Sequence, residues 1–266
     1  MRGGAQSHLM RASDGNFYIV KFQNNPQHVR VLANELLATR LAERLGLPVA
    51  ASEVLEVGDW LVNKTPELHI QIGAQRVPCK PGLQFGSRYV VDPIDGQVLD
   101  YMPESLLCDS QVRNSEMFLG ALVFDKWACN ADGRQVIYWR GANERKYHAT
   151  MVDQGHCFHA GDWSFPDSPL RGTFNFNGVY EPVRGWDSFE PWLSLIEDMD
   201  ENIVWSIAES VPPEWYQGNW NALETLLKEL LSRRTRVREL IAEFGASSRR
   251  PFPKWISGGK AASGKA

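Results

Sequence analysis

The sequence predicts an α+β fold of two lobes, in which a small β-rich lobe with one long helix precedes a larger, mainly helical lobe. Strand and helix patterns alternate in the first half of the chain, whereas helical periodicity dominates the second half. The 266 residues are 43% hydrophobic, which is enough apolar content for a sizeable core. We expect an N-lobe over residues 1–92, a C-lobe over residues 93–244 and a flexible tail over residues 245–266.

The N-lobe is predicted to open with a strand and a long helix. Residues 16–22 (NFYIVKF) are aromatic and β-branched and follow the turn pair Asp14-Gly15, which is typical of a strand. Residues 26–45 have helical periodicity, begin with a proline and end before Gly46.

The remainder of the N-lobe is predicted to be mostly short strands. Residues 51–57 and 60–62 flank Gly58-Asp59, a pattern that indicates a hairpin. Residues 71–86 are rich in glycine and proline, which favours an irregular connection, and residues 88–92 (RYVVD) indicate a short strand.

The C-lobe is predicted to contain a buried helix, two strands and further helices. Residues 115–127 (SEMFLGALVFDKW) are strongly apolar, which predicts a buried helix. The elements expected after it are strands over 135–140 and 147–152, an irregular aromatic stretch over 158–185, and helices over 191–210 and 219–244.

Charge and cysteine content restrict the location and the partners of the protein. The net charge is −4 and the pI is near 5.9, whereas nucleic-acid binders carry a basic excess, so nucleic acid is not an expected partner. The four cysteines form no C-x-x-C pair and no signal peptide precedes them, which favours reduced thiols in the cytoplasm. No apolar run approaches the roughly 20 residues that cross a bilayer, so we expect no membrane partner.

Lys21 and Glu35 form the first candidate pair. Lys21 lies on the predicted strand and shares a face with Ile19, although an edge-strand lysine with its head in solvent would give the same pattern. Glu35 lies on the predicted helix, where its same-face neighbours carry no charge: Val31, Leu32, Ala38 and Thr39. A carboxylate without a local cation either reaches solvent or pairs across space, and Lys21 is a natural partner. Kinases hold the α- and β-phosphates of ATP with such a pair.

Two aspartates form the second candidate pair. Asp132 lies in the polar loop ACNADGR directly after the apolar helix, and Asp153 ends a predicted strand and precedes Gln154-Gly155. Either could be an ordinary turn aspartate. A carboxylate at a strand end followed by glycine also suits metal binding, because its position is well defined and the glycine lets the chain turn away. Residues 2–7 (RGGAQS) could present backbone amides to phosphates, although glycines near a terminus are often merely flexible.

Together these motifs resemble a HipA-like kinase domain, from a family that is distantly related to the protein and phosphoinositide kinases. The resemblance rests on RGG, YIVKF, NELLATRLAERLGLPV, FDKWACNADGRQ and VDQGH, and it runs from Met1 to about Phe244. It implies a two-lobed protein-kinase-like fold that uses ATP and Mg²⁺ and transfers phosphate to a Ser or Thr of a protein substrate, with a lipid or small-molecule acceptor left open.

The resemblance also implies a role for each candidate residue. Asp132 would be the catalytic base and Asp153 a Mg²⁺ ligand. The residues implied in nucleotide binding are Gly3, Gly4 and Ser7 of the first loop, Lys21 and Glu35 on the phosphate side, and Val90 and Asp92 of an adenine-facing hinge.

Two departures from the family pattern open an alternative. The family carries an asparagine, its second metal ligand, five residues after the catalytic aspartate, where this chain has Ile137. Asn130 and Gln135 are the candidate replacements, and without one the chain would be a pseudokinase that binds nucleotide or a partner. No strand precedes Gly3, which leads us to expect that the native start lies upstream of Met1.

Three further patterns have more ordinary explanations. His156, Cys157 and His159 have no second ligand pair at zinc-site spacing. The run Asp198-x-Asp200-x-Asn202 lacks the glycine of a calcium loop. The basic run over 233–238 complements a helix C-terminus, with RNA binding as a weaker reading.

Overall fold

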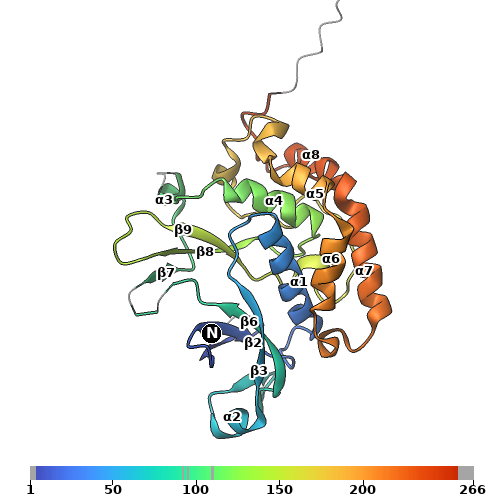
Figure 1. Ribbon diagram of the computed structural model, residues 1–266. Helices are drawn as coiled ribbons and strands as arrows, with labels where there is room; N and C mark the ends of the chain where they lie inside the picture. The colour runs from blue at the N-terminus through green and yellow to red at the C-terminus, as the bar shows by residue number, and fades with distance from the viewer. Residues whose placement is uncertain (1–3, 92, 95, 109–110, 257–266) are drawn as a thin grey trace, which may run out of the picture.

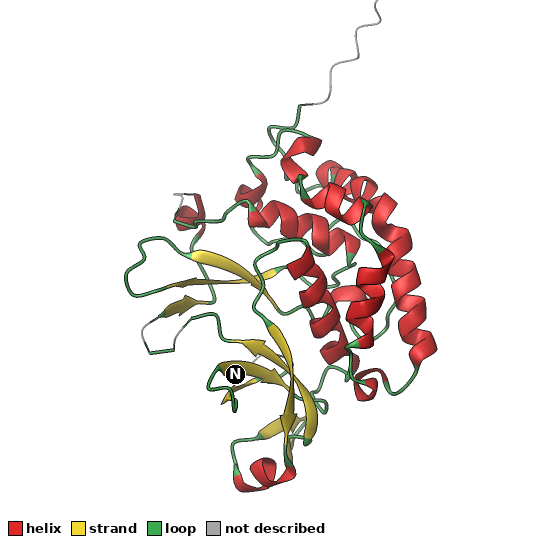
Figure 2. Cartoon of the chain, in the orientation of Figure 1, coloured by secondary structure: helices red, strands yellow, loops and turns green. Residues whose placement is uncertain are grey.

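A computed structural model describes residues 4–91, 93–94, 96–108 and 111–256. It confirms the α+β, two-lobed architecture: a small lobe is mostly strands, a larger lobe holds most of the helices, and helix α1 (Arg30–Arg44) lies beside both (Figures 1 and 2). No helix in this described part is both long enough and apolar enough to cross a membrane.

The N-lobe is built on a four-stranded antiparallel sheet. Its strand order is β1 (His8–Arg11), β2 (Phe17–Lys21), β6 (Gly82–Arg88) and β3 (Ser52–Val57). In the register of the two central strands, Lys21 is opposite Phe85. Lys21 is therefore the last residue of a central strand, held at the end of the sheet that faces α1.

The irregular connection predicted over residues 71–86 is wrong, because this range forms part of a hairpin and most of strand β6. The hairpin pairs β4 (His69–Ile72) with β5 (Gln75–Pro78), and β6 ends where the strand over 88–92 was expected to start. The glycines of β6 hid its strand pattern, yet Gly86 serves packing, because a Cβ there would lie 2.5 Å from a methyl carbon of Leu55.

The predicted hairpin over residues 51–62 is wrong in its second half. Strand β3 forms as expected, but residues 60–62 belong to helix α2 (Asp59–Lys64). Gly58 adopts an extended conformation at the N-cap, and Asp59 places a carboxylate in the first turn, where its negative charge interacts favourably with the helix dipole. A glycine–aspartate pair can start a helix as readily as it can turn a hairpin.

Helix α1 joins the two lobes through a nearly all-round buried surface. It begins at Arg30, later than the predicted residue 26, because Asn25 organises a preceding turn: its Oδ1 accepts hydrogen bonds from the backbone N–H groups of Gln27 (3.0 Å) and His28 (3.3 Å). Eleven of its fifteen residues are buried, including Glu35. A charged side chain in this position needs partners inside the protein.

The C-lobe contains a second antiparallel sheet, of order β7 (Gln97–Leu99), β8 (Gln135–Arg140) and β9 (His148–Val152). The predicted strands over 135–140 and 147–152 are confirmed by β8 and β9. Helix α4 (Met117–Trp127) lies between β7 and β8 in the chain, and every one of its residues is buried. The other C-lobe helices are α3 (Glu104–Cys108), α5 (Trp192–Glu197), α6 (Glu201–Glu209), α7 (Trp220–Ser232) and α8 (Val237–Ala246).

Both long helices predicted near the C-terminus are divided in two. The break between α5 and α6 occurs at Asp200, which caps α6 by accepting a 2.9 Å hydrogen bond from the backbone N–H of Asn202. The acidic run that resembled a calcium loop is thus a helix cap. The division between α7 and α8 is a 3₁₀ turn over Arg233–Arg236.

The segment after α8 packs against the C-lobe up to the last described residue, Ile256. Phe252 stacks on Trp255 with ring centroids 5.6 Å apart and meets Phe244 edge-on at 5.7 Å. The backbone N–H of Ile256 donates to the carbonyl of Arg184 at 2.9 Å. Residues 247–256, which were expected to belong to a flexible tail, are therefore part of the packed lobe.

Candidate active site

Three charged side chains from three different elements meet between the lobes. Lys21 comes from the end of β2, Glu35 from the middle of α1, and Asp153 directly follows β9. The Nζ of Lys21 lies 2.9 Å from Oδ1 of Asp153 and also forms an ion pair with Glu35. The side chains of Lys21 and Glu35 are almost fully buried, whereas that of Asp153 is 29% exposed. Asp153 is therefore the member of this triad that a ligand can reach.

Glu35 also fixes the turn that carries Asp153. Its carboxylate accepts hydrogen bonds from the backbone N–H groups of Gln154 and Gly155, each at 3.0 Å. A Cβ on Gly155 would lie 2.5 Å from a methyl carbon of Val31 on the same helix, so only glycine permits this approach. Asp153 itself has a φ of +57°, a conformation that the surrounding contacts must hold. The turn is therefore attached to α1 and sets the direction of the aspartate.

The charge states of the triad follow from burial and pairing. Burial alone would lower the pKa of Lys21, but the carboxylates of Glu35 and Asp153 raise it above its ordinary value. For Asp153, burial opposes ionisation, yet the cation of Lys21 brings the pKa below its usual range. Burial raises the pKa of Glu35 against the pull of Lys21. At neutral pH the lysine is protonated and the reachable carboxylate of Asp153 is ionised.

Asp132 is presented to solvent on a loop whose backbone is fixed. Its backbone N–H donates to the side-chain oxygen of Asn130 (3.1 Å), and its carbonyl accepts from the N–H of Gly172 (3.0 Å). Its Oδ1 accepts from the N–H of Gly133 at 2.8 Å. Within the described ranges its carboxylate makes no ion pair, so Asp132 combines a fixed backbone with an exposed acid group.

The loops of Asp132 and Asp153 are joined at the same end of a β-hairpin. In the register of β8 and β9, Gln135 is opposite Val152, the residue before Asp153. The backbone N–H of Ala131 donates to the carbonyl of His156 at 2.9 Å, which connects the two loops directly. Two aspartates that are 21 positions apart in sequence are thereby placed on neighbouring loops.

A buried ion pair beneath the Asp132 loop is absent from the sequence prediction. Arg134 donates from Nε to Asp125 at 2.8 Å, and their side chains are 1% and 0% exposed. Arg134 also donates to the carbonyl of Val152 at 3.1 Å. The only sequence signal was a charged residue inside the apolar stretch over 115–127, which indicates a buried partner without identifying it.

Asn130, a predicted metal ligand, belongs to the same internal network. Its Nδ2 donates to Oδ1 of Asp125 at 3.0 Å and its Oδ1 accepts from the N–H of Asp132, and the residue is 1% exposed. Gln135, the other predicted replacement, is exposed at the start of β8. The side-chain amide of Asn130 is thus occupied inside the protein, whereas that of Gln135 is exposed and can reach a ligand.

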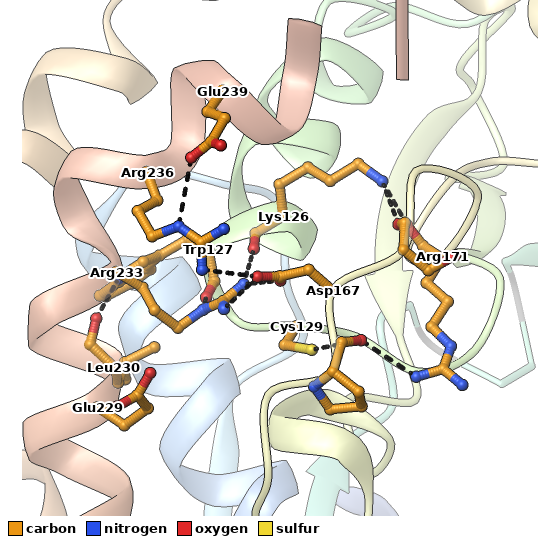
Figure 3. A network of polar contacts seen from close by, with 12 residues as sticks. Lys126, Trp127, Cys129, Asp167, Arg171, Glu229, Leu230, Arg233, Arg236 and Glu239 are labelled. Atoms are coloured by element: carbon orange, nitrogen blue, oxygen red, sulfur yellow. Dashed lines mark hydrogen bonds and ion pairs between the residues drawn. The ribbon is translucent and has the colours of Figure 1, made fainter. Parts of the chain in front are cut away.

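Basic residues anchor the end of α4 to the loop over 166–172. Lys126 donates from Nζ to the carbonyls of Pro169 (2.8 Å) and Arg171 (2.7 Å). Figure 3 shows Arg233 between the carbonyls at the end of α4 and the carboxylate of Asp167, to which it donates at 2.7 Å. This network holds the helix that leads into the Asp132 loop.

The predicted basic run is occupied by pairing inside the C-lobe. Arg233 and Arg236 pair with Asp167, Arg234 pairs with Glu201, and Arg238 pairs with Glu197. These ion pairs give the basic run a structural role. Because its charges are already paired with carboxylates, they count against the RNA-binding alternative.

The first loop approaches the Asp153 turn through Gln27, whereas Val90 of the predicted hinge lies at a separate cavity. A Cβ on Gly4 would lie 2.7 Å from Nε2 of Gln27, which itself lies 3.0 Å from Nε2 of His156. Ser7 directly precedes β1. Val90 lines a cavity of about 510 Å³ whose walls include no member of the triad.

Two of the predicted nucleotide-binding residues, Gly3 and Asp92, lie outside the described residues. Within the described part, no group of three or more His, Cys, Asp or Glu side chains could hold a metal ion. A zinc site at His156–His159 is therefore not formed there. The partly exposed carboxylate of Asp153 has the chemistry of a Mg²⁺ ligand, because this ion binds proteins through one or two carboxylates together with substrate phosphates.

Comparisons with known proteins identify the family of the chain and relatives of its fold. The sequence model of the HipA-like kinase family matches residues 1–144, which is more than half of the chain. No curated protein matches the sequence.

Three solved structures share the fold of the chain. It is similar to the proinflammatory kinase CtkA of Helicobacter pylori, with a TM-score of 0.55 and 15% identity over 91% of this chain and 94% of that one. It is also similar to the golgi casein kinase (TM-score 0.51, 13% identity, 93% and 72% covered). The third is HipA of Shewanella oneidensis MR-1 in its complex with HipB and operator DNA (TM-score 0.52, 13% identity, 93% and 67% covered). At these identities the likeness shows the fold alone.

Proposed function

The chain belongs to the HipA-like kinase family, and from this premise we propose that it transfers the γ-phosphoryl group of Mg-ATP to a Ser or Thr hydroxyl of a protein. Its kinase-type fold and family assign it to the phosphotransferases. The observation that carries the finer proposal is the contact of Lys21 with both Glu35 and Asp153. Such a lysine is held in place to meet the α- and β-phosphates of a nucleotide.

Each member of the triad has a part in binding the nucleotide in this proposal. Lys21 supplies positive charge to the phosphates, and Glu35 holds it through an ion pair. Asp153 and Gln135 would hold Mg²⁺, which would supply positive charge against the negative charge that develops on the phosphates during transfer. Gly4 and Ser7 belong to the first loop, which approaches the Asp153 turn through Gln27 and would face the phosphates.

Asp132 is the proposed general base. Its exposed carboxylate accepts the proton of the acceptor hydroxyl as the hydroxyl oxygen forms a bond to the γ-phosphorus. The bond between the γ-phosphorus and the bridging oxygen breaks, and the electron pair stays on ADP. Because such transfer depends on positioning and charge, the fixed backbone of the Asp132 loop supports this role.

The lobes and the location are part of the proposal. We place the N-lobe over residues 1–92 and the C-lobe from residue 93 to at least residue 256, because Phe252 and Trp255 pack against its helices. Cys79, Cys129 and Cys157 are buried free thiols, which supports a reducing compartment such as the cytoplasm.

A pseudokinase is the second candidate, and two observations favour it. Ile137 occupies the position of the family's second metal ligand, and the amide of Asn130 is bound inside the protein. In this case Mg-ATP would bind between the lobes without phosphate transfer.

The test compares the wild type with Asp132→Asn, Asp153→Asn and the control Asp187→Asn, an exposed aspartate on a C-lobe turn. We expect Mg²⁺-dependent phosphate transfer to fall about 10²–10⁴-fold in the first two variants and to stay unchanged in the control. Stabilisation by Mg-ATP should persist in Asp132→Asn and weaken in Asp153→Asn. Equal transfer in all four proteins would reject the kinase assignment, and stabilisation without any transfer would favour the pseudokinase.

A further inference from the structure

A second cavity adjoins Asp132. Its volume is about 380 Å³, and none of Lys21, Glu35 and Asp153 lines it. Its walls include Asp132 and Gln135 of the catalytic hairpin, Asp100, Tyr101 and Glu104 of the segment around α3, and Phe176. If an acceptor hydroxyl approached Asp132 through this cavity, the residues that flank it in its own chain would lie in the cavity.

One wall of this cavity is an open strand edge. Strand β9 pairs with β8 from Gln135 to Trp139, whereas β7 pairs only with Tyr138–Arg140. In the described part of the chain, no strand pairs with Gln135–Ile137 on the β7 side. A strand edge of this kind can accept an extended peptide through backbone hydrogen bonds.

The charge of the cavity is negative and uncompensated. The carboxylates of Asp100, Glu104 and Asp132 are exposed, and none of them makes an ion pair within residues 96–108 and 111–256 or with the described N-lobe. The single cation in the walls, Arg134, is 4% exposed and is bound to the buried Asp125. Three unpaired carboxylates around one space attract a cation.

The uncharged walls suit an arginine and the chain that carries it. Tyr101 is 67% exposed, and Phe174 and Phe176 add aromatic surface on which a planar guanidinium can stack. Tyr138, also a wall residue, is 2% exposed, and its hydroxyl lacks a hydrogen-bond partner in the described part of the protein. Buried polar groups are normally hydrogen-bonded, so this unpartnered hydroxyl marks the wall as a place where a polar group can bind.

We propose that this cavity docks the acceptor and selects a Ser or Thr within an extended, arginine-containing segment of a protein. The backbone of the segment pairs along Gln135–Ile137, its arginine binds Asp100 and Glu104, and its hydroxyl reaches Asp132. The proposal rests on the kinase function above and adds the chemical class of its acceptor.

Two peptide series test the proposal. The first has a central serine flanked by arginine, alanine or glutamate, and its readout is kcat/KM for phosphate transfer. The second has alanine in place of the serine, and its readout is the Kd from fluorescence anisotropy. The variants are Asp100→Lys/Glu104→Lys and the control Glu56→Lys, an exposed, unpaired carboxylate on β3.

We expect the wild type to prefer arginine over alanine, and alanine over glutamate, by at least about 10-fold per step in both series. Arginine gains opposite-charge contacts with Asp100 and Glu104, whereas glutamate meets like charges there. The double variant should reverse the order without changing the KM for ATP, and the control should keep it. Equal binding of the three non-acceptor peptides, or an order that the double variant leaves unchanged, would overturn the docking proposal. Because binding is measured without transfer, a protein that binds the arginine peptide but transfers no phosphate would refute only the kinase function.

Discussion

Replacement of Glu35 by glutamine is the sharpest perturbation of the site. The change preserves size and removes one negative charge from a side chain that is 3% exposed. A glutamine Oε1 can still accept one of the backbone N–H groups of Gln154 and Gly155, but its amide nitrogen cannot accept the other. Lys21 keeps only Asp153 as an ionised partner.

The magnitude follows from these three losses. Removing one partner of a buried pair costs about 3–5 kcal/mol when the other charge is left alone. Here Asp153 still compensates Lys21, which reduces the cost, while the N–H group that loses its acceptor adds about 1 kcal/mol. We therefore expect Glu35→Gln to lower the free energy of unfolding by about 2–3 kcal/mol. Phosphate transfer should fall about 10²-fold, because Lys21 would draw Asp153 toward itself and away from the metal.

The assay is urea unfolding followed by fluorescence, together with Mg²⁺-dependent phosphate transfer under conditions where the variant is folded. A double-mutant cycle with Lys21→Met isolates the pair, and we expect a coupling energy of about 1–3 kcal/mol. Glu56→Gln, on the exposed face of β3, is the matched control and should change stability by less than about 0.5 kcal/mol. A Glu35→Gln protein as stable and as active as this control would refute the argument.

Three further predictions concern buried groups beneath the site. Arg134→Met should lower stability by about 3–5 kcal/mol by leaving Asp125 charged and unpaired, and Arg134→Met/Asp125→Leu should regain most of it; urea unfolding that shows no recovery would contradict this. Burial raises the pKa of the Cys157 thiol well above its ordinary value, so iodoacetamide at pH 8 should alkylate it at least about 10²-fold more slowly in the native than in the unfolded protein, and equal rates would contradict its burial. Burial lowers the pKa of Lys126 from 10.5 to about 8, so the unfolded chain binds more protons than the native protein between these pH values. The free energy of unfolding of the wild type, relative to that of Lys126→Met, should therefore rise from pH 8 to 10.5 by up to about 3 kcal/mol, and a fall over this window would contradict the lowered pKa.

The sequence was most informative where a charged residue lay in a local pattern that predicts burial. Glu35 lies among uncharged neighbours on its helix, so a partner for its carboxylate had to come from another element. The structure places Lys21 against it. The two aspartates were identified by their position after a predicted helix and a predicted strand, with a glycine one residue after Asp132 and two residues after Asp153. The structure brings these loops together through the β8–β9 hairpin, whose strands alternate clearly enough to be predicted.

The features that sequence reasoning missed depend on contacts between distant segments. Strand β6 was read as a connection because Gly82 and Gly86 weaken a strand pattern, and only the nearby Leu55 shows why a glycine is needed. The partners of Asp125 and Arg233 lie 9 and 66 positions away, at Arg134 and Asp167. A single sequence shows that such charges need partners, but it does not show which segments fold against each other.

The departure at Ile137 has a structural explanation that bears on the choice between kinase and pseudokinase. Strand β8 begins at Gln135, only three residues after Asp132, so Ile137 lies within a strand and pairs with Thr150 rather than lying in a loop. Gln135 is the residue at the loop end of this strand, opposite the residue that precedes Asp153. We infer that the shorter loop transfers the role of the second ligand to Gln135, whose additional methylene extends its amide further than an asparagine would reach. On this reasoning Gln135→Ala should impair Mg²⁺-dependent transfer and Ile137→Ala should not; the opposite result would leave the second metal ligand without a candidate in this hairpin and favour the pseudokinase.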